Sequence, residues 1–141
     1  MKYEIQLEIN EKVERVAALY IDKDLMHLWE QGLIRVDSHQ GNLFETGSKG
    51  ALVFMFNQTE MQMKVTVEKN RLPQSLSVIY EVPGAWNRFD VQFIDIGGRT
   101  KCICESEFIF DKPNNIPVEA FIDKTTEGMN HFKRFVEGKN A

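Results

Sequence analysis

Apolar residues recur at intervals of three and four positions along residues 116–137, a spacing that places them on one face of a helix. The predicted apolar face consists of Val118, Phe121, Ile122, Thr125, Met129, Phe132 and Val136. Asn114 or Asn115 is a candidate N-cap, and Pro117 suits the first turn because it lacks an N–H group. Such a helix is about 30 Å long, which matches the length of a strand of eight to ten residues.

Most of the chain before this helix alternates apolar and polar residues, which predicts strands with one buried face. In the first strand, Tyr3, Ile5 and Leu7 alternate with charged or amide side chains. The predicted strands are residues 2–9, 33–39, 44–56, 60–68, 76–80, 88–93 and 101–110. Two short helices are expected after the first strand, one capped by Asn10 and one ending near Gly32.

This order of elements predicts the fold class α+β in a single domain that spans residues 1–141. We expect one curved antiparallel sheet of six or seven strands, with two short helices and a long C-terminal helix across its concave face. A helix in that position encloses space against the sheet. That space is the expected location of function.

Composition and charge exclude several classes of protein. Hydrophobic residues make up 43% and charged residues 27% of the chain, as in a globular protein. The 17 basic and 21 acidic residues give a net charge of -4 without any basic run, which argues against a nucleic-acid partner. No apolar stretch approaches the roughly 18 residues of a membrane span, and the N-terminus lacks the apolar core of a signal peptide. Cys102 and Cys104 are poorly placed to bridge each other, so we expect a cytoplasmic location.

The element order resembles the helix-grip fold of the START/Bet v 1-like (SRPBCC) superfamily, which includes polyketide cyclase/dehydratase-like proteins. Trp29 and Gly32 at the end of the second short helix, glycines at Gly41 and within 47–50, and the closing amphipathic helix carry this resemblance. It covers the whole chain. It implies that a lipid, sterol, polyketide or other apolar molecule binds between the sheet and the last helix.

The inward-facing positions are mostly apolar, which is typical of a ligand cavity with a few orienting hydrogen bonds. The same residues would also fill a solid core, and the resemblance favours the cavity. Trp86, expected in the loop 83–87, is a candidate for the cavity rim because a broad, rigid ring contacts apolar ligands well. The candidate ligand-binding residues are Met63, Val78, Tyr80, Trp86, Phe89, Val91, Cys104, Ser106, Phe121, Thr125 and Met129.

No catalytic residue, metal site or cofactor is predicted. The inward positions supply no carboxylate and no histidine for acid–base chemistry, and His27, His39 and His131 are expected at the surface. Glu105 and Glu107 share the outward face of their strand. The two cysteines are too few for a structural zinc site, which needs four ligands. The expected function is therefore binding of a small apolar or aromatic molecule.

Two alternative functions stay open at this point. An enzyme of the polyketide cyclase/dehydratase kind would use Tyr80 and a second hydroxyl to orient its substrate. An Aha1-like protein-interaction module would act through its outer surface, as the group that assists the chaperone Hsp90 does. The sequence is compatible with a monomer and with a homodimer.

Overall fold

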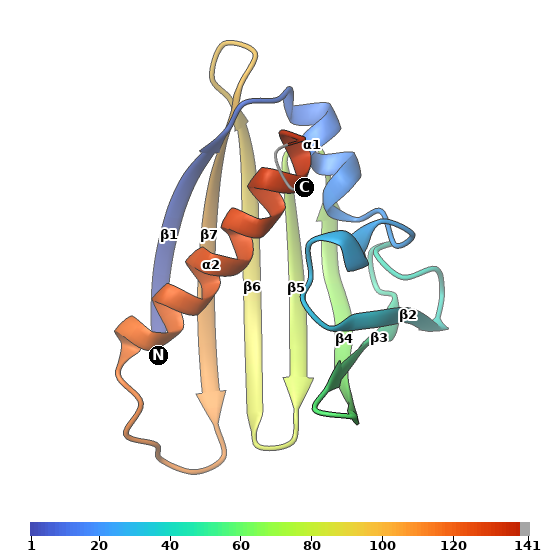
Figure 1. The fold of residues 1–141 in the computed structure, drawn as a ribbon, viewed down its shortest axis with the longest axis vertical. Helices are drawn as coiled ribbons and strands as arrows, with labels where there is room; N and C mark the ends of the chain where they lie inside the picture. Colours follow the sequence, from blue (N-terminus) through green and yellow to red (C-terminus); the bar gives the residue numbers. More distant parts are fainter. Residues whose placement is uncertain (139–141) are drawn as a thin grey trace.

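The computed structural model describes residues 1–138. Seven strands form one curved antiparallel sheet in the order β1-β7-β6-β5-β4-β3-β2, and the helices lie on its concave side (Figure 1). The strands are β1 (Lys2–Ile9), β2 (Leu33–Gln40), β3 (Lys49–Phe56), β4 (Thr59–Arg71), β5 (Ser75–Val82), β6 (Ala85–Asp95) and β7 (Thr100–Phe110). The helices are α1 (Val13–Tyr20), the single 3₁₀ turn η1 (Met26–Leu28) and α2 (Val118–Val136). The predicted α+β fold, with a long C-terminal helix across the sheet, is confirmed.

The first strand joins the sheet through the last one. Tyr3 lies opposite Ser106, and Ile5 lies opposite Cys104. The N-terminal nitrogen of Met1 donates a hydrogen bond to the carbonyl oxygen of residue 108 at 3.1 Å. β1 also contacts α2, so the first strand and the last helix of the fold lie side by side near this edge of the sheet (Figure 1).

The residues that cap the two α-helices differ from the prediction. Pro117 is the N-cap residue of α2, and no side chain caps this helix. Asn114 instead accepts a hydrogen bond from the backbone N–H of Ile116 at 3.0 Å, inside the preceding loop. Asn10 does not cap α1 either, since the N-cap residue there is Lys12 and no side-chain cap forms. Both predicted caps are therefore wrong, although both helices form where the apolar spacing places them.

The predicted strand over residues 44–56 is wrong in its first part, because β3 begins at Lys49. A turn precedes it, in which Phe44 has a φ of +85°. The buried Ser48 hydroxyl holds this turn, since it accepts from the N–H of Phe44 at 3.1 Å and donates to the carbonyl oxygen of Glu45 at 2.6 Å. A buried aromatic residue on a turn thus continues the apolar pattern of a strand without belonging to one.

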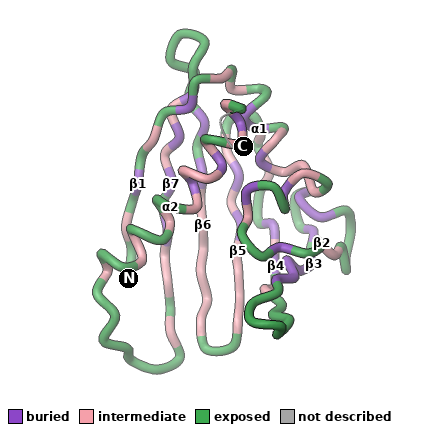
Figure 2. The backbone as a smooth tube through the Cα atoms, viewed as in Figure 1, coloured by how far each residue is buried: buried purple, intermediate pink, exposed green. Residues whose placement is uncertain are grey.

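One end of α2 is fixed by a cluster of aromatic rings. Phe132 is 0% exposed, and its ring centroid lies 5.1 Å from that of Tyr20 and 4.8 Å from that of Trp29. Tyr20 also packs edge-on against Phe93 of β6 at 5.7 Å. Figure 2 shows the buried residues gathered toward this end, whereas the opposite halves of β5, β6 and β7 are of intermediate exposure. The concave face is therefore tightly covered at one end and loosely covered at the other.

α2 is amphipathic along its length. Its first turn carries Glu119 and its last turn carries Lys133 and Arg134, an order of charges that complements the helix dipole. Among the helices within residues 1–138, none combines the length and hydropathy that crossing a bilayer requires.

Truncation of Phe132 tests whether this cluster fixes α2. Phe132→Ala removes a fully buried ring that packs against two others, so we expect the free energy of unfolding to fall by about 3–5 kcal/mol. Urea denaturation followed by circular dichroism measures the change. Thr126→Ala, on the exposed side of the same helix, is the control and should change stability by less than about 0.5 kcal/mol. Equal stabilities for the two variants would show that the cluster does not hold the helix.

Candidate functional site

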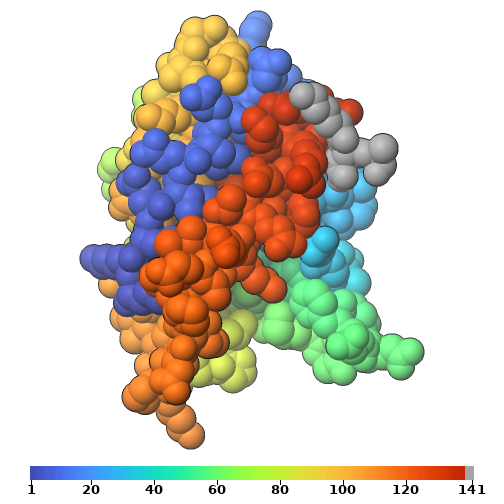
Figure 3. Space-filling view, turned by 60° about the vertical axis from the view of Figure 1, so that its left-hand side comes forward, coloured from blue at the N-terminus to red at the C-terminus, as the bar shows by residue number. Residues whose placement is uncertain are grey.

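A cavity of about 520 Å³ lies between the middle of α2 and the loosely covered part of the sheet. In Figure 3 the surface is hollowed between α2 and the green β3–β4 hairpin. This volume falls in the range of roughly 300–1,000 Å³ that is usual for small-molecule sites. The aromatic residues of the wall are Tyr20, Trp29, Phe44, Phe54, Phe56, Tyr80, Phe89 and Phe108.

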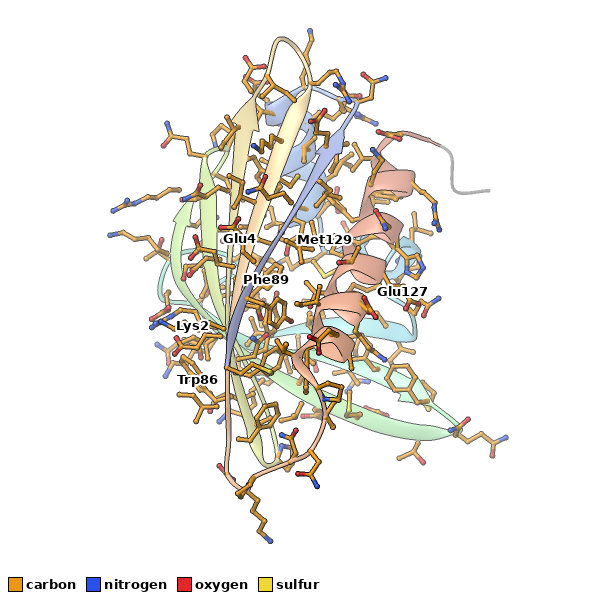
Figure 4. The ribbon with its side chains drawn as sticks, turned by 90° about the vertical axis from the view of Figure 1, so that its left-hand side faces the viewer. Lys2, Glu4, Trp86, Phe89, Glu127 and Met129 are labelled. Carbon is orange, nitrogen blue, oxygen red and sulfur yellow. The ribbon has the colours of Figure 1, made fainter. Side chains whose placement is uncertain are left out.

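Five of the predicted ligand-binding residues line this cavity. They are Met63 from β4, Tyr80 from β5, Phe89 from β6, and Thr125 and Met129 from α2. In Figure 4 the side chains of Phe89 and Met129 point toward each other across the space between sheet and helix. The hydroxyl of Thr125 already shares a hydrogen bond of 2.6 Å with the hydroxyl of residue 3, so this contact joins β1 to α2.

Four other predicted residues lie in the core beyond the cavity. Val78, Val91 and Cys104 are each 1% exposed, and Ser106 is 3% exposed. None of the four lines the cavity. Burial raises the pKa of the Cys104 thiol well above its usual range, and it raises the pKa of the Cys102 thiol to about 12. Both cysteines therefore stay protonated and behave as small apolar residues.

The position expected for Trp86 is wrong. The loop ends at Gly84, β6 begins at Ala85, and Trp86 pairs with Glu81 inside the sheet. Its side chain projects from the convex face, on the side of the sheet away from α2 (Figure 4). There its ring lies 5.4 Å from the guanidinium carbon of Arg88, a cation–π distance. Trp86 is thus not at the rim of the cavity.

Phe121 lies beside the cavity and is not part of its wall. Its ring packs against Phe108 at 5.1 Å and against Phe110 at 5.6 Å. Because Phe108 does line the cavity, Phe121 supports the wall from behind.

The expectation that no carboxylate faces inward is wrong, because Glu30 lines the cavity. Glu30 follows η1, where its backbone N–H donates to the carbonyl oxygen of Met26 at 3.0 Å. The chain then turns at Gly32, whose φ is +80° and whose carbonyl oxygen accepts from the N–H of Met55 at 2.8 Å. The backbone around Glu30 is therefore held against β3, which directs the carboxyl into the aromatic wall.

Burial raises the pKa of Glu30 from its ordinary value of 4.5 to about 7. No hydrogen bond or ion pair to this carboxyl forms within residues 1–138 to offset the loss of water. Burial also raises the pKa of Tyr80 and of Tyr20, and the nearby Glu30 carboxyl adds to both shifts. The two phenols stay protonated and can donate hydrogen bonds, whereas the carboxyl changes charge near neutral pH.

Asn87 is a second polar residue of the wall that the sequence pattern missed. Its amide nitrogen donates to the hydroxyl of Ser106 at 2.8 Å and to the carbonyl oxygen of Glu107 at 3.0 Å. A carbonyl oxygen only accepts, so the contact with residue 107 fixes which amide atom is the nitrogen. The amide oxygen of Asn87 is left as an acceptor on the cavity side of β6.

The mouth of the cavity lies along α2. Lys124 and Glu127 are exposed there, and His131 is half-buried, so its expected surface position is only partly correct. Figure 4 shows Glu127 on the outer side of the helix, whereas Met129 points inward. No residue of the loop before α2 lines the cavity. Within the described chain, no group of three or more His, Cys, Asp or Glu side chains is arranged to hold a metal ion.

The pH dependence of stability tests the environment of Glu30. Folded protein keeps the Glu30 proton up to about pH 7, whereas the unfolded chain loses it near pH 4.5. The free energy of unfolding should therefore fall as pH rises between these values, by roughly 3 kcal/mol at most, and then level off. Glu30→Gln should remove this decrease and should be more stable than the native protein at pH 8. Glu127→Gln is the exposed control, and an identical pH profile for both variants would contradict the assignment.

Gly128 faces open space in the cavity wall. A Cβ added there meets nothing within 4 Å, whereas one added at Gly50 would lie 2.0 Å from the carbonyl oxygen of Asp37. Alanine is favoured over glycine inside a helix by roughly 1 kcal/mol, so Gly128→Ala should raise the melting temperature. Gly50→Ala should lower it. A lower melting temperature for Gly128→Ala would show that the helix packs more closely than described.

No protein-family model matches this sequence. No curated protein matches it either. Solved structures match it over nearly their whole length. The crystal structure of Ara h 8.0201 has a TM-score of 0.81 at 10% identity, and the match covers 98% of both chains.

Two bacterial structures give similar results. An uncharacterized protein from Rhizobium leguminosarum has a TM-score of 0.80 at 14% identity, with 97% of this chain and 94% of that chain covered. An AHSA1-like protein from Aeromonas hydrophila has a TM-score of 0.76 at 20% identity, with 98% and 93% covered. At these identities the likeness extends to the fold alone. The chain therefore shares the fold of these structures, a helix-grip fold with a long helix across a curved antiparallel sheet.

Proposed function

We propose that this protein binds a small, mainly apolar or aromatic molecule, without covalent chemistry, in the cavity between α2 and the sheet. The observation that carries the proposal is the 520 Å³ cavity, whose wall is mainly apolar and includes eight aromatic residues. Aromatic side chains provide large contact areas and lose few rotamers on binding, which favours the uptake of flat apolar ligands.

The residues proposed to contact the ligand include Met63, Tyr80, Phe89, Thr125 and Met129, since all five line the cavity. The other predicted residues in the core and beside the cavity would act by holding the wall in shape. A cytoplasmic location is part of the proposal. It is supported by the two free, buried cysteines, which need no oxidising compartment.

A second candidate function is catalysis of the cyclase/dehydratase kind. One observation favours it: the Glu30 carboxyl, with a pKa of about 7, lies in the same cavity as the Tyr80 hydroxyl. A carboxyl that changes charge near neutral pH suits general acid–base work, and a protonated phenol can orient a carbonyl oxygen. Catalysis would require turnover of a substrate in addition to binding.

Uptake of an uncharged dye tests the binding proposal. N-phenylnaphthylamine should bind one molecule per chain, detected as increased dye fluorescence. Gly128→Leu should reduce the affinity at least about tenfold, because the leucine side chain extends into the open space beside residue 128 and fills part of the cavity. The thermal stability of this variant should match or exceed that of the native protein.

Trp86→Ala is the matched control, because it removes a large ring from the convex face. Its dye affinity should equal that of the native protein. Absence of dye binding to the native chain would overturn the cavity proposal and favour an Aha1-like module that acts through its surface. Binding that survives Gly128→Leu and weakens in Trp86→Ala would place the ligand on the convex face.

A further inference from the structure

Three features of the cavity wall favour a ligand that carries a hydrogen-bond donor or a positive charge. The first is the Glu30 carboxyl, which makes no hydrogen bond or ion pair within residues 1–138. The second is the amide oxygen of Asn87, which is left over once its nitrogen binds Ser106 and Glu107. The third is the set of aromatic faces, whose negative quadrupole attracts cations.

The charges around the cavity also favour a cationic ligand. Among the described residues that line it, Lys124 is the one permanent cation, and it is exposed on α2. Glu127 lies one helical turn further on and carries the opposite charge. Once Glu30 is ionised, the carboxylates of Glu30 and Glu127 outnumber the ammonium of Lys124 among the cavity-lining residues. An uncharged ligand would leave this charge without compensation.

From this arrangement, and on the basis of the proposed binding function, we propose that the ligand is an amphipathic amine with an aromatic or aliphatic body. Its ammonium group pairs with the Glu30 carboxylate, and its apolar body lies against the aromatic wall. The Glu30 carboxylate is half-buried, so a contact with an ammonium gives it a charge-assisted hydrogen bond in place of part of its lost hydration. The Tyr80 ring, which also lines the cavity near Glu30, adds cation–π attraction at the same end.

The titratable groups that face this end set the pH dependence of binding. They are Tyr20 from α1, Tyr80 from β5, and Lys124, Glu127 and His131 from α2. The two phenols stay protonated, so Glu30 is the acidic group of the inner wall that gains its charge near neutral pH. The affinity for an amine should therefore rise between pH 5.5 and pH 8. At pH 7, binding should release about half a proton per ligand, because an ammonium binds only the ionised carboxyl.

Three matched probes test this proposal by isothermal titration calorimetry: naphthylethylamine, naphthylethanol and naphthylacetate, all with the same ring isomer. At pH 8 the native protein should bind the amine at least about tenfold more tightly than the alcohol, and it should bind the carboxylate most weakly. At pH 5.5 the preference for the amine over the alcohol should shrink to about twofold or less.

Glu30→Gln should abolish the preference for the amine at pH 8 and leave the affinity for the alcohol unchanged. Glu127→Gln removes a charge at the mouth and should keep most of the preference. The pH dependence of the native protein provides a second measurement that needs no variant. Binding of the alcohol with no preference for the amine would overturn this inference and leave the proposed function standing. Failure of all three probes to bind would instead overturn the proposed function.

Discussion

The packing of the Phe132 ring against Tyr20 and Trp29, which also stack on each other, is the contact on which the rest of the structure depends. It fixes the C-terminal end of α2 over the sheet, while the middle of the helix stands off and leaves a cavity. Each aromatic pair contributes about 0.5–1.5 kcal/mol beyond the area that it buries. Phe132 makes two such pairs. The same cluster holds Trp29, the residue just before Glu30. The packing that fixes the helix therefore also fixes the polar end of the cavity.

The elements that could be predicted are those with a clear local period. The three- and four-residue spacing of α2 and the two-residue spacing of β1 each depend on near neighbours, and both elements form close to the expected bounds. Met63 and Phe89 were correctly assigned to the cavity side because the alternation of β4 and β6 is regular around them. Because α2 crosses one face of the sheet, the side chains on that face of β4 and β6 point toward the helix.

The parts that could not be predicted depend on turns and on contacts between distant segments. Phe44 is buried from a turn held by a single hydroxyl, and no local period distinguishes this from a strand. Trp86 was placed in a loop because the loop that begins with Pro83-Gly84 was extended three residues too far, to Asn87. Counting back from Phe89 would have put Asn87 inside and Trp86 outside. Glu30 follows a single 3₁₀ turn, which is too short to show an amphipathic pattern, so no signal in the sequence revealed its direction.

The pairing of β1 with β7 also determines the order in which this protein can fold. Its hydrogen bonds join residues as far apart as Met1 and Phe108, a separation of 107 positions. On the ribosome, β1 has no sheet partner until nearly the whole sheet has been synthesised, and it must wait as an unpaired strand. Closing so large a loop is entropically costly and makes folding slow in comparison with helical proteins of similar size. The β1–β7 pairing is thus the last part of the sheet that can form during synthesis.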